Sequence, residues 1–180
     1  NPHMPAYVSI HFPTGFSEER QLWISVEVCD EFGRTVFTTG DFDHNGDLRD
    51  EHSHAVLGGH THWDQHLLNF QSKFVGLATR GTERPLILSV NRQLTPLNIF
   101  RPAPAPVAAF GRPSTFRISK GSIAPLSTVS KNYSIRLPEQ AGNYGLRVRL
   151  NYRHLPPHLM DEIGTPHLKP LLETVVIDQH

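Results

Sequence analysis

The chain has 180 residues, enough to bury one sizeable hydrophobic core, so a single domain is expected. Its 17 Lys and Arg residues balance its 17 Asp and Glu residues, so no overall charge favours nucleic acid or an anionic membrane. No apolar run approaches the roughly 20 residues of a membrane-spanning helix, and a single cysteine, Cys29, excludes an intrachain disulfide, a multi-thiolate zinc site and a Cys-x-x-Cys-His haem attachment.

The N-terminal segment contains a turn and one candidate ligand. Residues 1–4 resemble a cloning remnant, and the expected domain covers residues 5–180. Residues 11–16 include a Pro-Thr-Gly turn ahead of the first strand. His11 is either a half-buried polar residue beside this turn or a neutral imidazole able to ligate a haem iron held by another segment.

Alternating apolar residues predict a β-hairpin. Residues 22–29 place four apolar side chains on one face, and residues 30–33 supply turn chemistry before a second strand at 34–38. Cys29 lies in the first strand without an activating partner, so a buried or half-buried structural thiol is expected.

Oxygen-bearing side chains recur at alternate positions after this hairpin. They are Asp41, Asp43, Asn45 and Asp47. With Gly46 allowing a sharp turn, the spacing matches the first half of an EF-hand loop and suits a hard cation such as Ca²⁺. His52 stands where that loop needs a bidentate Glu, so the segment is not an EF-hand. A solvated turn and a Ca²⁺ site remain the two interpretations.

A histidine-rich segment follows. Its histidines are His52, His54, His60, His62 and His66, out of twelve in the chain. In an extended segment His60 and His62 would point the same way, so both imidazoles could bind one Zn²⁺ or Cu²⁺ ion. Surface histidines in a long loop, a structural metal site and a catalytic metal site are the alternatives.

Two hydrolase signatures overlap this segment. Residues 59–62 equal the closing motif of calcineurin-like metallophosphoesterases, but the upstream motifs of that family are absent. His60, His62 and Asp64 resemble the opening of the metallo-β-lactamase motif, but Gln65 separates Asp64 from His66 where that motif has them adjacent.

The second half of the chain predicts further strands and little helix. Strands are expected at 86–90 and 133–137, and the stretch 96–113, which contains five prolines, is expected to be a long surface crossover. Short helices are expected between Pro156 and Gly164 and from Thr165 to Leu172. Leu67, Phe70 and Phe74 fit a helix or a strand almost equally well.

Residues 144–153 show the clearest strand pattern. Tyr144, Leu146, Val148, Leu150 and Tyr152 form a predicted core face. The opposite face carries Arg147, Arg149 and Arg153, either as a solvated surface or as a contact for an acidic partner. Antiparallel strands with one polar face predict a mainly β fold, an antiparallel β-sandwich (immunoglobulin-like or related) with long loops and one or two short C-terminal helices.

Several of these segments together are similar to the β-sandwich region of multihaem c-type cytochromes. They are residues 11–16, 18–20, 22–29, 33–37, 45–48, 68–75 and 150–157. The resemblance implies an extracytoplasmic electron-transfer protein, periplasmic or at the cell surface, in which this region packs beside haems held by a neighbouring segment. Only His11 carries over as a haem contact. The chain lacks haem-binding cysteines, so it is not expected to transfer electrons by itself.

The expected function is therefore that of a non-catalytic accessory or interaction domain of a multihaem cytochrome-type protein. Haem would be present only through a neighbouring segment, and Ca²⁺ is the possible ion of this chain. Two alternatives stay open. One is a metal-dependent hydrolase that uses His60, His62 and His66, and the other is a Ca²⁺-stabilised extracellular module that binds carbohydrate or protein.

Overall fold

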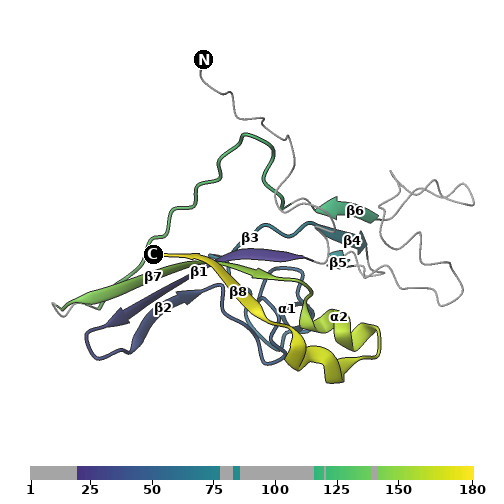
Figure 1. Ribbon diagram of the computed structural model, residues 1–180, viewed down its shortest axis with the longest axis horizontal. Coiled ribbons are helices and arrows are strands. Elements are labelled where there is room, and N and C mark those ends of the chain that lie inside the picture. Colours follow the sequence, from purple (N-terminus) through teal and green to yellow (C-terminus); the bar gives the residue numbers. More distant parts are fainter. Residues whose placement is uncertain (1–19, 78–82, 86–115, 120, 139–141) are drawn as a thin grey trace, which may run out of the picture.

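The computed structural model describes residues 20–77, 83–85, 116–119, 121–138 and 142–180 (Figure 1). Within these residues the chain is mainly antiparallel β-strand with a few short helices. The elements are β1 Gln21–Asp30, β2 Thr35–Thr39, α1 His54–Leu57, β3 Leu68–Asn69, β4 Lys73–Leu77, β5 Glu83–Pro85, β6 Phe116–Ser119, β7 Tyr144–Arg153, α2 Pro157–Glu162, the 3₁₀ helix η2 Pro166–Leu171 and β8 Thr174–Gln179. The predicted mainly β class is confirmed.

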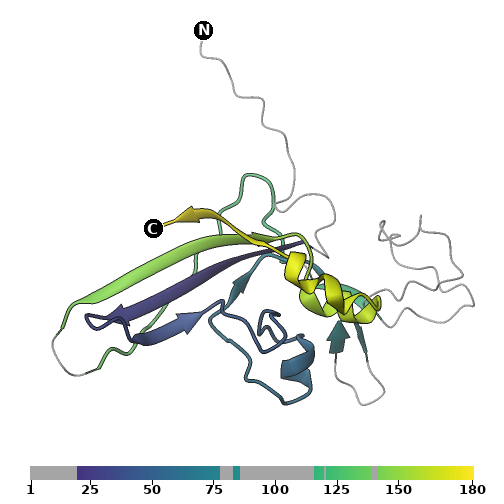
Figure 2. The same ribbon diagram turned by 60° about the horizontal axis from the view of Figure 1, so that its bottom comes forward.

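The described strands form two antiparallel sheets. The larger one has the order β2-β1-β7-β8, with β3 also pairing with β1, and the smaller one has the order β5-β4-β6. β1 and β7 pair along their whole length, from Gln21 opposite Arg153 to Asp30 opposite Tyr144. This pair and β2 make the long ribbon that extends away from the helices in Figure 2.

The predicted hairpin is present as β1 and β2, and Asp30 closes its turn. The Asp30 carboxylate accepts hydrogen bonds from the backbone nitrogens of Phe32 and Arg34, both at 2.9 Å, and from Arg34 Nε at 2.7 Å. Gly33 adopts a φ of 78°, which an L side chain rarely does. Cys29 is half-buried near the end of β1, as expected.

Both faces of the sheet are buried at the start of β1, which differs from the expected single wet face. Leu22 is 1% exposed and Trp23, on the opposite face, is 0% exposed. On β7 the buried residues are Asn151 and Arg153, whereas Leu146, predicted for the core, is 62% exposed. The prediction of a solvated face was therefore wrong at Arg153, and that of a core position was wrong at Leu146.

The loop that follows β2 explains this difference. Trp23 Nε1 donates a hydrogen bond to the Gly40 carbonyl oxygen at 3.0 Å, and the Trp23 ring lies edge-on to Phe42 with centroids 5.6 Å apart. Arg153 donates a hydrogen bond to the Gly46 carbonyl oxygen from the same face. The loop thus covers one end of the arginine face, while Leu146 lies toward the other end of the ribbon.

The other elements match the sequence in part. Residues 133–137 are described and are not a strand, so that prediction was wrong; the Tyr133 ring instead lies edge-on to Phe37. The ambiguous segment around residues 67–74 contains β3 and the start of β4, so the strand interpretation holds there.

The C-terminal helices are present as α2 and η2. The second is a 3₁₀ helix with Pro170 inside it. α1, β5, β6 and β8 were not predicted. The predictions at residues 1–4, His11, 86–90 and 96–113 lie outside the described residues. No described helix has the length and apolar character needed to cross a membrane.

Candidate functional site

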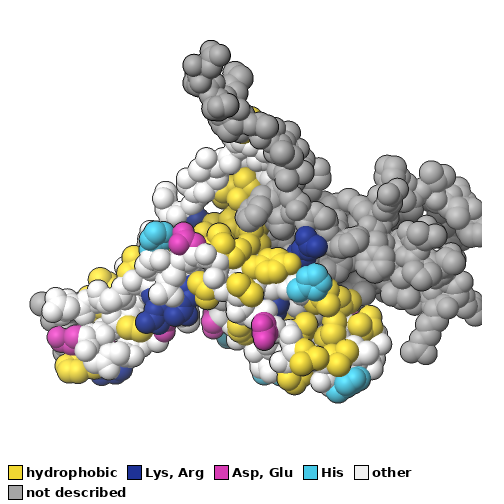
Figure 3. All heavy atoms as spheres, viewed as in Figure 1, with side chains coloured by type: hydrophobic (Ala, Val, Ile, Leu, Met, Phe, Trp, Pro, Cys, Tyr) yellow, Lys and Arg dark blue, Asp and Glu magenta, His cyan; other side chains and the backbone are white. Residues whose placement is uncertain are grey.

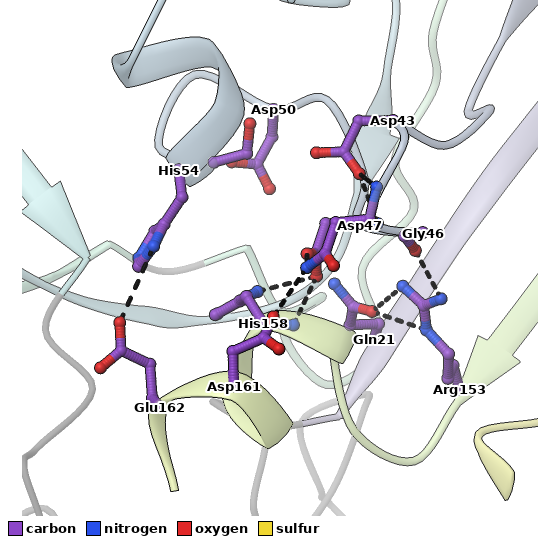
Figure 4. Close-up of polar contacts among 12 residues, drawn as sticks. Gln21, Asp43, Gly46, Asp47, Asp50, His54, Arg153, His158, Asp161 and Glu162 are labelled. Carbon is purple, nitrogen blue, oxygen red and sulfur yellow. Dashed lines mark hydrogen bonds and ion pairs between the residues drawn. The ribbon is translucent and has the colours of Figure 1, made fainter. Parts of the chain in front are cut away.

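A buried arginine joins the acidic loop to the larger sheet. Arg153 donates from Nε and Nη2 to Gln21 Oε1 at 2.9 and 2.6 Å, and from Nη1 to the Gly46 carbonyl oxygen at 2.8 Å (Figure 4). Its guanidinium lies 4.8 Å from the ring centroid of Phe42 and 5.6 Å from that of Trp23. These contacts make Arg153 a structural residue of the fold.

The charge of Arg153 is balanced at longer range by the loop. Burial lowers the pKa of Arg153 to about 10, and the nearby carboxylates of Asp47 and Asp43 oppose this shift. The guanidinium therefore stays protonated at neutral pH, and its field stabilises negative charge in the loop.

The first two predicted calcium ligands bind protein groups in the structure. Asp43 Oδ1 accepts hydrogen bonds from the backbone nitrogens of Asn45 and Asp47, at 2.8 and 2.9 Å, which closes a tight turn. Asp41 Oδ1 pairs with Arg49 Nη2 at 2.5 Å.

The next two predicted ligands contact α2 and η2. Asp47 Oδ1 accepts hydrogen bonds from the His158 backbone nitrogen at 3.1 Å and from His158 Nδ1 at 2.8 Å. Asn45 donates from Nδ2 to Asp47 and to Asp161, and Lys169 Nζ lies 2.5 Å from Asn45 Oδ1 and 2.6 Å from Asp161 Oδ1. These contacts tie the loop to the C-terminal helices (Figure 4).

These contacts lower the pKa of two carboxyl groups, those of Asp47 and Asp161. Burial would raise the pKa of Asp47, but the hydrogen bonds and charge of His158, with a hydrogen bond from Asn45, hold it below its ordinary value. The hydrogen bond from Lys169 is the main reason that the pKa of Asp161 is lowered. The four predicted ligands thus lie in one loop among cationic side chains. In the part of the chain that the structure describes, no group of three or more His, Cys, Asp or Glu side chains is arranged to hold a metal ion.

The histidine-rich segment contains a helix that the sequence did not indicate. Ser53 caps α1, since its side chain accepts a hydrogen bond from the Val56 backbone nitrogen at 3.3 Å. His54, the first residue of α1, packs on His158 with ring centroids 5.2 Å apart and lies 3.8 Å from Glu162. A paired imidazole from residue 158 could not be foreseen because the contact joins distant parts of the chain.

Three further histidines, His60, His62 and His66, follow α1. All three are exposed: His60 lies in a bend, His62 in an irregular stretch and His66 in a turn. His66 packs edge-on against Phe37 with ring centroids 5.6 Å apart. Asp64 is buried and has a structural role, because its Oδ2 accepts hydrogen bonds at 2.8 Å from Thr39 Oγ1 and from the backbone nitrogen of Gly40.

A surface pocket of about 330 Å³ lies beside this segment, and we call it the Asp50 pocket. It is lined by Asp50, Glu51, His52, Trp63, Asp64, Gln65, Leu67, Asn69, Gln71, Lys73, Gly121 and Lys131. Asp50 forms an ion pair with Lys73 and accepts a hydrogen bond from Asn69 Nδ2 at 3.3 Å. Asp50 and Glu51 follow the acidic loop in the sequence, and no local pattern indicates that Lys73 or Lys131 approaches them in the fold.

Comparisons with known proteins give no relative: no family model, no curated protein and no solved structure matches this chain. The resemblance to multihaem cytochromes therefore remains a prediction from the sequence.

Proposed function

We propose that this chain is a non-catalytic interaction domain that packs, outside the cytoplasm, against a haem-bearing segment or protein. The sequence resemblance supplies the kind of partner. The structural observation that supports an interaction role is an exposed apolar surface on the C-terminal elements.

This C-terminal apolar surface lies on α2, η2 and β8. It consists of Ile163, which caps α2, Leu168 and Leu171 of η2, and Val175, Val176 and Ile177 of β8, where Val176 points to the face opposite to that of Val175. All six residues of β8 are exposed, and Ile177 and Val175 are 52% and 51% exposed. Figure 3 shows hydrophobic side chains gathered over these elements.

The position of β8 adds to this argument. β8 is at the edge of the larger sheet and pairs only with β7 among the described strands. Exposed apolar edge strands are templates for association, and proteins usually protect them with charge or with a covering segment. A neighbouring protein segment packed on β8 would remove this apolar surface from water.

The arginines of β7 are the contacts for acidic groups in this proposal. Arg147 and Arg149 keep the role first expected for three arginines, since Arg153 is buried. Arg149 Nε donates to Gln179 Oε1 of β8 at 2.7 Å, so its charge lies beside the apolar surface. Haem propionates or acidic side chains of a partner would meet a positive charge there.

The proposal includes the finer architecture expected from the sequence, in which the two sheets belong to one β-sandwich. The loop after β2 covers the face of β1 that carries Trp23, so burial of Leu22 on the opposite face is the observation that supports a second layer there.

Affinity capture tests the proposal. The immobilised domain is incubated with the extracytoplasmic fraction of cells that make it, and retained protein is read by Soret absorbance and haem staining. We expect the wild type to retain a haem protein and the Val175→Lys/Ile177→Lys variant to retain little, because two buried charges would oppose the interface. Arg136→Ala, a change in an exposed residue outside these elements, is the matched control. Capture of no haem protein by the wild type would contradict the proposal.

The metal-dependent hydrolase is the alternative from another functional class. Phosphatase and lactamase assays with added Zn²⁺ or Mn²⁺ separate the two. The non-catalytic proposal predicts no turnover above background. Metal-dependent turnover that is lost in both His60→Ala and His62→Ala would replace it with the hydrolase.

A further inference from the structure

The Asp50 pocket has a size suited to a small ligand. Its volume of about 330 Å³ lies at the lower end of the range found for small-molecule sites. The pocket is open to solvent, so a ligand could be the terminal unit of a longer molecule. None of its lining residues belongs to the C-terminal apolar surface.

The polar groups of the pocket are held in place by the fold. Asp50 and Lys73 side chains are each only 14% exposed and form an ion pair. Asn69 Oδ1 accepts a hydrogen bond from the Gln71 backbone nitrogen at 3.0 Å, and Gln71 Oε1 accepts one from Gln21 at 3.3 Å. Because these side chains are already ordered, binding costs little conformational entropy.

An aromatic side chain completes the lining. Trp63 is 47% exposed, whereas Trp23, the other tryptophan of the chain, is 0% exposed. A half-exposed indole among polar groups offers a flat apolar surface next to hydrogen-bonding partners. A pyranose ring suits such a site, because its C–H groups can pack on an aromatic face while its hydroxyls both donate and accept hydrogen bonds.

The charges of the lining argue for a neutral ligand. The carboxylates of Asp50, Glu51 and Asp64 are accompanied by the ammonium groups of Lys73 and Lys131. A strongly anionic ligand would meet the carboxylates, and a strongly cationic one would meet the lysines. Hydroxyl groups can bind to both kinds of side chain.

We propose that the Asp50 pocket is a binding site for a neutral pyranose sugar unit, with Trp63 as the stacking surface and Asp50, Asn69 and Lys73 as hydroxyl partners. This inference is independent of the haem-partner proposal, since the two surfaces share no residue.

The test is a titration of the intact chain with methyl glycosides of neutral hexoses and of N-acetylhexosamines, up to tens of millimolar. The readout is tryptophan fluorescence and its quenching by acrylamide. Because Trp23 is buried, bound sugar should chiefly protect Trp63 from the quencher. Calorimetry measures the same binding in variants without Trp63.

Trp63→Ala is expected to weaken sugar binding by roughly tenfold. Glu51→Gln, a change at an exposed rim residue, should weaken it less. Phe32→Ala, which removes an aromatic side chain that is 74% exposed on the hairpin turn, is the matched control and should bind as the wild type does. Circular dichroism establishes that each variant is folded.

Three results would overturn the proposal. They are no binding by any sugar of the panel, equal binding by the wild type and Trp63→Ala, and tighter binding of glucuronate than of the matching neutral glycoside. A neutral sugar that binds the wild type and Phe32→Ala but binds Trp63→Ala weakly supports it.

Discussion

Among the described residues, the direct hydrogen-bond acceptors of the buried cation Arg153 are neutral. Arg153 bonds to Gln21 Oε1 and to the Gly46 carbonyl oxygen, and its charge is offset only at longer range by Asp43 and Asp47. Truncating it would leave these acceptors unsatisfied and remove the group that lies over Trp23.

We therefore expect Arg153→Ala to lower the free energy of unfolding by about 3 kcal/mol. Urea unfolding followed by circular dichroism measures it. Arg147→Ala is the control, because Arg147 is half exposed and pairs with Glu27 at 3.0 Å, a contact worth at most about 1 kcal/mol. Equal losses in the two variants would contradict a structural role for Arg153.

The contact between Asp47 and His158 makes stability depend on pH. The folded pKa of Asp47 is below its ordinary value of 3.8, so in the range around that value the unfolded chain binds more protons than the folded one. The stability from this carboxyl is present above 3.8 and is lost as pH falls through the folded pKa.

The wild type should therefore lose stability as pH falls from about 5 to about 3. His158→Ala should lose less over this interval, since it removes the main partner that lowers the pKa of Asp47. His167→Ala, a change in an exposed histidine of η2, serves as the control and should follow the wild type. Parallel curves for His158→Ala and the wild type would rule out this linkage.

At the residue scale, the hydrophobic periodicity of the sequence predicted where the strands lie better than it predicted which of their side chains are buried. Leu22 and Val26 are buried as expected. Arg153 was expected on a wet face because it alternates with apolar residues, but a loop from another part of the chain covers it. Alternation along one strand carries no information about such distant cover.

Gly40 determines how the chain leaves β2. Its φ is 74°, and a Cβ added there would lie 2.6 Å from the Ile24 carbonyl oxygen. Its own carbonyl oxygen and backbone nitrogen bond to Trp23 and Asp64. Any side chain at this position would strain the backbone and push the loop away from β1.

Gly40→Ala should accordingly lower the free energy of unfolding by about 2–3 kcal/mol. Gly145→Ala is the matched control, because a Cβ there meets no atom within 4 Å, and its effect should stay within about 0.5 kcal/mol. Thermal and urea unfolding both report the difference. Comparable stability of the two variants would contradict the close approach at Gly40.

The calcium interpretation of loop 41–47 has its own test. It predicts that Ca²⁺ raises the melting temperature of the wild type, because an ion bound only by the folded state stabilises it. The increase should disappear in Asp43→Ala and persist in Asp30→Ala, a carboxylate of the hairpin turn. No change with millimolar Ca²⁺ in the wild type would leave the loop as a protein-bonded turn.

At the element scale, local signals were the reliable ones. The β1–β2 hairpin was predictable because Asp30 and Gly33 form its turn within a few residues. β8 was missed because its short Val-Val-Ile run has no alternation. Its partner strand β7 is also separated from it in the sequence by α2 and η2. The strand expected at 133–137 is absent, and the alternating residues there do not share a core face: Tyr133 packs edge-on against Phe37, whereas Leu137 is exposed.

At the scale of the whole molecule, the two proposed surfaces come from residues far apart in sequence. The lining of the Asp50 pocket combines residues from the histidine-rich segment, β3, β4 and residues 121 and 131. The C-terminal apolar surface depends on β8 being at the sheet edge. Composition and motifs could not place either surface, because both depend on strand pairing between distant segments.

The most direct test of the interaction role is sedimentation velocity of the captured haem protein, recorded at the Soret wavelength where this chain does not absorb. Addition of the wild-type domain should move the Soret boundary to a larger sedimentation coefficient, and addition of Val175→Lys/Ile177→Lys should leave it in place. A boundary that stays unchanged with the wild type, or moves equally with both proteins, would contradict a haem-bearing partner docked on β8.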